Sequence, residues 1–295
     1  GNNILYIVAS GGKQELWVSD AGGYDRRKII SINDRKLVDP KWSTDGNYIY
    51  FLSDFSLDGD KQKSSDVKVI TRRFYRSDGE GYQHDRRMHV FRAEVNAAES
   101  KITQITSGSF DVLAFDFSPD GSEIAIVTNI DKEADFQNNM DIFTIPSTGG
   151  SLRKIHANKG PIAALSYSPT GMDIAFIGDD YRFKFNSPLE VWILERSSGN
   201  VVNISHELDR AARNSVVCDV SMDDSTVPPL WKGVEEITFV ATDRGRCNIY
   251  SANAKTRHVK AITTGDQLIT SQTISRDGTI AYVKMDPVHL PELYI

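Results

Sequence analysis

The sequence predicts an all-β protein in which one unit of four strands is repeated along the chain. Three observations support this prediction: a tight-turn motif recurs between apolar strands, the strands after each turn keep the same order, and no segment has the periodicity of an amphipathic helix. With 295 residues, of which 40% are apolar, the chain can build a packed core, which excludes a disordered or fibrous protein.

The recurring turn motif is Ser-x-Asp-Gly or a close variant, preceded by an aromatic or aliphatic residue. It occupies residues 42–46, 117–121, 167–171 and 274–278. Ser and Asp side chains bond to nearby backbone amides and Gly accepts a positive φ, so each copy predicts a hairpin between apolar strands. The successive Ser residues are 75, 50 and 107 positions apart. Because the last interval is about two units long, a degenerate copy is expected midway, at residues 230–233.

Each turn is followed by further strands in a fixed order. Third strands are expected at residues 89–93, 141–145, 190–194 and 248–252, and fourth strands at residues 102–106, 152–156, 201–205 and 259–263. The N-terminus supplies only strands two to four, at residues 4–9, 16–19 and 27–30. The C-terminus supplies only strands one to three, at residues 270–275, 279–284 and 292–295. Both terminal units are therefore expected to be incomplete.

Units of roughly 40 to 50 residues that each form four antiparallel strands are the signature of β-propeller blades. We therefore expect one β-propeller domain over residues 1–295 with about six blades, or seven if a further blade lies upstream. The blades cover approximately residues 1–31, 37–106, 111–156, 162–205, 216–263 and 268–295. With incomplete terminal blades, the ring lacks the shared blade that usually locks a propeller, unless residues outside the chain supply it.

The second blade carries a long insertion, residues 54–87, between its second and third strands. This gap has 34 residues, against ten in the third and fourth blades. A loop of this length in a compact domain is usually functional or disordered. The candidate substrate or domain-interface residues in it are Arg72, Arg73, Arg76, Asp78, Glu80 and Tyr82. Their position and charge favour a structured excursion, and a solvated loop whose charges pair with one another is the alternative.

Charge and motif content argue against several functions. The net charge of −6 gives no electrostatic basis for binding nucleic acid or an anionic membrane, and no apolar run approaches the ~20 residues of a membrane helix. No nucleophile elbow, phosphate-binding loop, dinucleotide fingerprint or metal-binding histidine spacing occurs, so we predict no catalytic residue, cofactor or metal in this chain. Cys218 and Cys247 indicate reduced thiols in a cytoplasmic protein, with one disulfide between them as the alternative.

Two features of the sequence resemble a known family. Ser-Pro-Asp-Gly turns followed by Ile-Ala-Phe-type strands are similar to the propellers of the prolyl oligopeptidase family and of TolB-like proteins. Residues 70–82 (ITRRFYRSDGEGY), with residues 86–91 (RRMHVF), resemble more specifically the acylaminoacyl-peptidase-like members of that family. This resemblance implies an N-terminal propeller that precedes an α/β-hydrolase domain with a Ser-Asp-His triad. Nothing in the chain matches that hydrolase domain.

The resemblance implies a non-catalytic role for this chain. The propeller of such a serine peptidase gates access to the active site: it admits oligopeptides and excludes folded proteins, while the hydrolase domain of the same parent chain performs catalysis. The candidate residues of the insertion then bind peptide termini or the domain interface. A free-standing TolB-like propeller that serves protein interactions is one alternative. A propeller enzyme with paired carboxylates around its own pocket is another.

Overall fold

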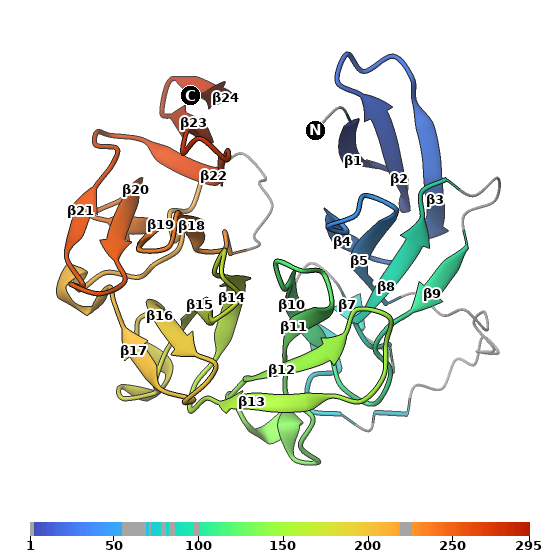
Figure 1. Ribbon diagram of the computed structural model, residues 1–295, viewed down its shortest axis with the longest axis horizontal. Helices are drawn as coiled ribbons and strands as arrows, with labels where there is room; N and C mark the ends of the chain where they lie inside the picture. Colours follow the sequence, from blue (N-terminus) through green and yellow to red (C-terminus); the bar gives the residue numbers. More distant parts are fainter. Residues whose placement is uncertain are drawn as a thin grey trace. The chain divides into compact units, whose positions relative to one another are not determined.

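The computed structural model describes residues 3–54, 69–70, 72–77, 81–82, 86–96, 101–218 and 226–295. These residues form an all-β protein, and its described helical segments are single 3-10 turns at Ala134–Phe136, Lys184–Asn186 and His206–Leu208. The predicted fold class is confirmed, because several sheets are four-stranded and antiparallel and follow one another along the chain as propeller blades do (Figure 1).

Three sheets contain all four strands of a blade, paired in chain order. The second blade consists of β4 (Leu37–Trp42), β5 (Tyr48–Ser53), β8 (His89–Glu94) and β9 (Ile102–Gln104). The third blade consists of β10 (Val112–Phe117), β11 (Glu123–Thr128), β12 (Asp141–Pro146) and β13 (Arg153–Ala157). The fourth blade consists of β14 (Ile162–Tyr167), β15 (Asp173–Gly178), β16 (Glu190–Glu195) and β17 (Val201–Asn203).

The terminal blades have three described strands each. The first blade consists of β1 (Asn3–Ser10), β2 (Lys13–Asp20) and β3 (Arg27–Asn33), and the last of β22 (Leu268–Ile274), β23 (Ile280–Asp286) and β24 (His289–Tyr294).

The fifth blade consists of β18 (Leu230–Lys232), β19 (Glu236–Asp243), β20 (Arg246–Asn253) and β21 (Val259–Ala261). A single parallel bridge between Cys247 and Leu268 joins the fifth and last blades into one sheet. The degenerate turn expected at residues 230–233 is present, since β18 pairs with β19 and Gly233 has a φ of 68°.

The predicted turns have the geometry that their residues indicate. After β10, the Ser118 hydroxyl donates to Asp120 at 2.6 Å, and the Ser118 backbone N–H donates to the Glu123 carbonyl at 3.0 Å. Gly121 in this turn and Gly46 in the preceding copy both have a φ of 72°. A Cβ is strained at such a φ, which explains why glycine recurs at this point of the motif.

In the second, fourth and fifth blades the fourth strand is shorter than predicted, because side chains replace the backbone ladder at its end. The predicted strand of the second blade extends to Thr106, but β9 ends at Gln104, and the Thr106 hydroxyl accepts the N–H of Val90 at 3.0 Å. In the fourth and fifth blades, the hydroxyls of Ser205 and Thr263 accept the equivalent N–H groups at 2.8 and 2.9 Å. One hydroxyl therefore ends the ladder in each of these three blades.

A buried polar residue lies at the start of the third strand of three blades and two residues further along the third strand of the fifth blade. These tie residues are His89, Asp141, Glu190 and Asn248, and each is at most 6% exposed. Each contacts the fourth strand of its own blade or the residues just after it: His89 contacts Thr106, Asp141 the N–H of Asn158, Glu190 the amide of Asn203, and Asn248 the hydroxyl of Thr263. Because buried polar groups need partners, the tie residues fix the last strand of each blade.

The chain divides into two compact units, each with its own core. One unit consists of Gly1–Ala114, Thr128–Asn138 and Ile145–Leu152, and its core includes Leu16, Phe51 and Phe91. The other consists of Phe115–Val127, Asn139–Thr144 and Arg153–Ile295, with apolar clusters that contain Phe239 and Ile249. The single domain over residues 1–295 stays a prediction.

Candidate functional site

The described part of the insertion contains a short hairpin. Its strand β6 (Arg76–Ser77) pairs with β7 (Gly81–Tyr82). Arg72 and Arg73 precede this hairpin, whereas Asp78 and Glu80 lie outside the described residues. The described part of the insertion therefore contains hydrogen-bonded strands, as a structured insertion requires.

Arg72 is held by two carboxylates of the first compact unit. Its Nη2 lies 3.3 Å from Asp111 Oδ2, and its Nε lies 3.7 Å from Asp135 Oδ2. Asp111 also binds Arg87 Nη1 at 2.9 Å and accepts the N–H of Met88 at 2.8 Å. Since only 14% of its side chain is exposed, Arg72 docks the insertion onto the rest of the unit instead of presenting its charge to a ligand.

Arg73, Arg76 and Tyr82 are exposed, in contrast to Arg72. The Arg73 guanidinium lies 5.9 Å from the ring centre of Phe74 and 6.0 Å from that of Phe136, and the Arg76 guanidinium lies 5.9 Å from the ring centre of Tyr82. Arginine next to an aromatic face keeps its charge accessible and adds a surface for stacking. These five residues, named the Arg73 surface, offer both features to a peptide or a protein.

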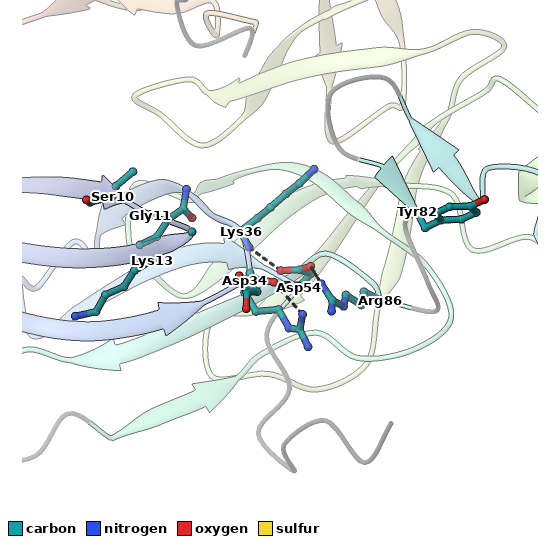
Figure 2. A pocket seen from close by; sticks show the side chains of 12 residues that line it. Ser10, Gly11, Lys13, Asp34, Lys36, Asp54, Tyr82 and Arg86 are labelled. Atoms are coloured by element: carbon teal, nitrogen blue, oxygen red, sulfur yellow. Dashed lines mark hydrogen bonds and ion pairs between the residues drawn. The ribbon is translucent and has the colours of Figure 1, made fainter. Parts of the chain in front are cut away.

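A pocket of about 550 Å³ takes its walls from segments of the first unit that are far apart in sequence. This cavity, named the Lys36 pocket, is lined by Ala9, Ser10, Gly11, Gly12, Lys13, Gln14, Asp34, Arg35, Lys36, Asp54, Tyr82 and Arg86. Figure 2 shows Ser10, Gly11 and Lys13 at one side of the pocket and Tyr82 at the other, with the charged residues between them. Of the candidate residues from the sequence, Tyr82 belongs to this pocket.

Two guanidinium groups meet at one backbone carbonyl in the Lys36 pocket. Arg35 Nη1 and Arg86 Nη1 donate to the Asp34 carbonyl oxygen at 2.9 and 3.1 Å. Asp54 Oδ1 accepts the N–H of Lys36 at 2.7 Å, and Asp54 Oδ2 lies 3.9 Å from Arg86 Nη1. Burial, followed by the positive charge of Arg86, lowers the pKa of Arg35. The arginine charges are thus drawn together by a neutral acceptor.

Two histidines and one cysteine with shifted pKa values lie in the blades: His89 and Cys247 are buried and His156 is half-buried. Burial lowers the pKa of His89 and His156, and burial raises the pKa of the Cys247 thiol to about 11. Cys247 and Cys218 are not joined in a disulfide. Within the described ranges, no three His, Cys, Asp or Glu side chains gather in a way that would hold a metal ion. The same ranges contain no helix with the length and apolar character needed to cross a membrane.

Comparison with known families identifies the type of propeller. The family model described as "Acylaminoacyl-peptidase, N-terminal beta-propeller domain" matches residues 1–287. The chain belongs to this family. The predicted membership in the acylaminoacyl-peptidase-like group is therefore confirmed.

Solved structures share the fold at low sequence identity. The acylaminoacyl peptidase of Pyrococcus horikoshii aligns over 100% of this chain and 42% of its own, with a TM-score of 0.71 and 15% identity. An acylaminoacyl peptidase in complex with Z-Gly-Gly-Phe-chloromethyl ketone has the same coverage and identity, with a TM-score of 0.72. TolB from Acinetobacter baumannii aligns over 99% of this chain and 60% of its own, with a TM-score of 0.60 and 15% identity. This chain therefore spans 42% to 60% of the length of these relatives.

Proposed function

We propose that this chain is the non-catalytic propeller domain of a serine peptidase. An α/β-hydrolase domain of the same parent chain performs catalysis, and the propeller admits oligopeptides and excludes folded proteins by size. The observation that carries this proposal is the membership of residues 1–287 in the family of acylaminoacyl-peptidase propellers. We also propose a cytoplasmic location, on the basis of the two cysteines in the sequence.

The comparison structures support a peptide substrate. The ligand in one of the matching peptidases, Z-Gly-Gly-Phe-chloromethyl ketone, is a blocked tripeptide. This chain aligns to 42% of that peptidase, which agrees with a propeller that controls access and a separate domain that performs catalysis. Selection by access acts before any bond is cleaved, because a substrate that cannot reach the reacting groups is never positioned against them.

Within this function we assign two roles to the insertion. Arg72 anchors it, because this side chain is mostly buried against Asp111 and Asp135. Arg73, Arg76 and Tyr82 contact the peptide or the hydrolase domain, because they are exposed beside aromatic rings. Asp78 and Glu80 remain candidates for the same contacts on the basis of sequence.

The full reading frame that contains this chain provides the main test. The parent protein is purified and assayed on N-acylated peptides of about two to twenty residues, and on a folded protein beside its unfolded form. We expect cleavage of short peptides, loss of activity with increasing length, and no cleavage of the folded protein. A parent protein without a hydrolase domain, or one that cleaves the folded protein as fast as the short peptides, refutes the proposal.

The two roles of the insertion are separated by matched arginine variants of the parent protein. Arg73→Ala/Arg76→Ala is expected to raise KM or alter peptide-length preference while the melting temperature stays unchanged. Arg72→Ala is expected to lower the melting temperature because it removes a buried anchor. Arg257→Ala, an exposed arginine of the other unit, is the control. Unaltered KM and length preference in the double variant would show that the exposed arginines do not contact substrate.

A second candidate function is a free-standing propeller that binds other proteins. The observation that favours it is the match to TolB from Acinetobacter baumannii over 99% of this chain. Under this alternative the parent protein has no peptidase activity, and the double arginine variant weakens association with a protein partner instead of changing peptide cleavage. The peptide assay on the parent protein therefore decides between the two functions.

A further inference from the structure

Exposed aromatic side chains are concentrated in one kind of connection between strands. Among the described residues, seven Phe, Tyr or Trp side chains are exposed, and six of these lie between the second and third strands of a blade. The six are Phe74, Tyr75 and Tyr82 in the second blade, Phe136 in the third, and Phe183 and Phe185 in the fourth. The seventh is Tyr24, between the third and fourth strands of the first blade. Grouped exposed apolar side chains mark interaction surfaces, so this connection is a candidate for one.

In the fourth blade the aromatic residues belong to a short connection between β15 and β16. This segment, named the Phe185 loop, covers residues 179–188 and lies wholly within one compact unit. Phe183 is 61% exposed and Phe185 is 80% exposed. The ring centre of Tyr181 lies 5.9 Å from that of Phe185, with the two rings edge to face at 78°. The loop therefore presents two rings to the solvent, and one of them is supported by a third.

Hydrogen bonds hold the Phe185 loop in this conformation. The Asp179 carboxylate accepts the N–H of Tyr181 at 2.7 Å, and the Tyr181 carbonyl accepts the N–H of Lys184 at 3.0 Å. The Ser187 hydroxyl accepts the N–H of Phe183 at 2.9 Å. Tyr181 and Lys184 have φ values of 59° and 54°, which residues other than glycine rarely adopt. The rings are therefore placed before a partner arrives, which reduces the entropy lost on binding.

Arg182 anchors the loop to its blade and leaves the neighbouring rings outside. Its Nη2 lies 2.7 Å from Oε2 of the buried Glu190, and its Nη1 lies 3.3 Å from Oδ1 of Asp180. Only 26% of the Arg182 side chain is exposed. Arg72 anchors the insertion of the second blade in the same way, next to the Arg73 surface. Two blades thus combine a mostly buried arginine with exposed aromatic rings in the same connection.

We propose that the Phe185 loop docks against the hydrolase domain of the parent chain, a choice of partner that rests on the proposed function. The acylaminoacyl peptidase of Pyrococcus horikoshii aligns to this chain over 42% of its own length, so more than half of that protein has no counterpart here. Aromatic residues are enriched in the cores of protein interfaces. A permanent neighbour is favoured over a passing peptide, because rings left in water between substrates are an aggregation liability.

Charge adds a requirement for the surface of the partner. The Lys184 side chain is exposed between the two phenylalanines, and within the described part of the chain it forms no ion pair. We therefore expect an apolar surface on the hydrolase domain with a carboxylate at its margin. Such a carboxylate would pair with Lys184 at the polar rim of the interface.

Hydroxyl-radical footprinting tests the proposal without any peptidase activity, because it measures the solvent accessibility of single side chains. The 295-residue chain is compared with the parent protein. We expect Phe183 and Phe185 to react about fivefold more slowly in the parent protein, since exposed fractions of 61% and 80% fall to those of buried rings. Tyr24, at 88% exposed, and Met172, at 70% exposed in the same blade as the loop, are the controls and should react equally in both proteins.

A double variant separates docking from folding. Phe183→Ser/Phe185→Ser removes only exposed rings, so the melting temperature of the 295-residue chain should not change. The parent protein should melt about 3 °C lower or more, because it loses two interface anchors. Met172→Ser, at an exposed apolar residue of the same blade, is the matched control and should change neither melting temperature. If the double variant does not fold, footprinting of the wild-type proteins decides.

Each outcome supports or overturns the inference. Protection of both rings in the parent protein, with Tyr24 and Met172 unprotected, supports it. Full reactivity of the rings in a parent protein that has a hydrolase domain and cleaves peptides overturns it, while the proposed function stands. Protection that requires a bound peptide chloromethyl ketone, or that is lost on dilution, overturns it in favour of a peptide or of a second copy.

The two proposals can also fail separately from the other side. If the parent protein has a hydrolase domain but cleaves a folded protein as fast as short peptides, the gating function fails, and protected rings still support docking. A parent protein without a hydrolase domain overturns both proposals through its sequence alone.

Discussion

The replacement of Glu190 by alanine tests how much one tie residue stabilises its blade. The Glu190 side chain is 1% exposed and accepts contacts from Arg182 at 2.7 Å, Asn203 at 2.9 Å and His206 at 3.1 Å. A hydrogen bond to a charged group contributes about 1.5 to 3 kcal/mol, and removal of one partner of a buried ion pair costs about 3 to 5 kcal/mol. Arg182 also pairs with Asp180 at 3.3 Å, so part of its interaction survives.

We therefore expect Glu190→Ala to lower the free energy of unfolding by about 2 to 3 kcal/mol, which is within the range for a hydrogen bond to a charged group and below that for a fully buried pair, because Arg182 and His206 are partly exposed. The exposed side chains of the network become solvated again, while Asn203 loses an acceptor inside the blade. Glu190→Gln keeps the shape and one acceptor, so a loss of about half that size is expected. In thermal unfolding the alanine variant should melt on the order of 5 °C lower.

The assay is urea unfolding, monitored by tryptophan fluorescence. The free energies of unfolding of two variants are compared with a common m-value only where their measured m-values agree. Glu207→Ala, in the exposed turn next to His206, is the matched control and should unfold with the wild type. If Glu190→Ala also unfolds with the wild type, the tie residue does not stabilise its blade. If Glu207→Ala is destabilised equally, the effect belongs to the turn and not to the buried carboxylate.

Three further predictions concern a turn, an acid response and a thiol. Gly46→Ala should lower stability by about 1 kcal/mol in urea unfolding, because φ is 72° while no atom obstructs the new Cβ; unchanged stability would contradict the strain argument. Hydrogen bonds from Ser118 and then Ser122 lower the pKa of Asp120 from 3.8 to about 2, so its contribution is full above pH 3.8 and is lost as the pH falls toward 2. Asp120→Asn should therefore melt below the wild type at pH 7, and the two melting curves should converge over that acid range; a constant gap would refute this. Cys247, with a pKa of about 11, should resist alkylation at pH 8 in the folded chain and react in urea, and fast labelling of the native thiol would show that it is accessible.

Local chemistry explains why the fold could be predicted from the sequence. The turn at residues 117–121 depends on residues close in sequence: Ser118 bonds to Asp120 and to the Glu123 carbonyl, and Gly121 supplies the positive φ. The strands on each side then follow from apolar runs of strand length. The end of the fourth strand was predicted two residues too late in the second blade, because Thr106 ends the backbone ladder with its hydroxyl. A threonine fits a strand equally well, so its role depends on the neighbouring strand.

The candidate site was predictable only in part because it depends on contacts between distant segments. The insertion was recognisable from its length. The sequence does not distinguish Arg72 from Arg73, because the difference depends on distant residues. In the structure, Asp111 and Asp135 bind Arg72 and make it the anchor of the insertion. The Lys36 pocket joins residues 9–14 and 34–36 to Asp54, Tyr82 and Arg86. The paired glycines at 11–12 and the charged run at 34–36 were the available signals. Each alone is typical of an ordinary turn.

The tie residues show how repeats can diverge without loss of the fold. His89, Asp141, Glu190 and Asn248 occupy one position in four blades, yet they include an imidazole, two carboxylates and an amide. What the position preserves is the capacity to form a hydrogen bond in a buried place, not charge or shape. One polar residue can therefore replace another at this position. An apolar residue there would leave the end of the fourth strand without its hydrogen-bond partner. An alignment of these blades should therefore score polarity, not identity, at the first residue of β8, β12 and β16 and at the third residue of β20.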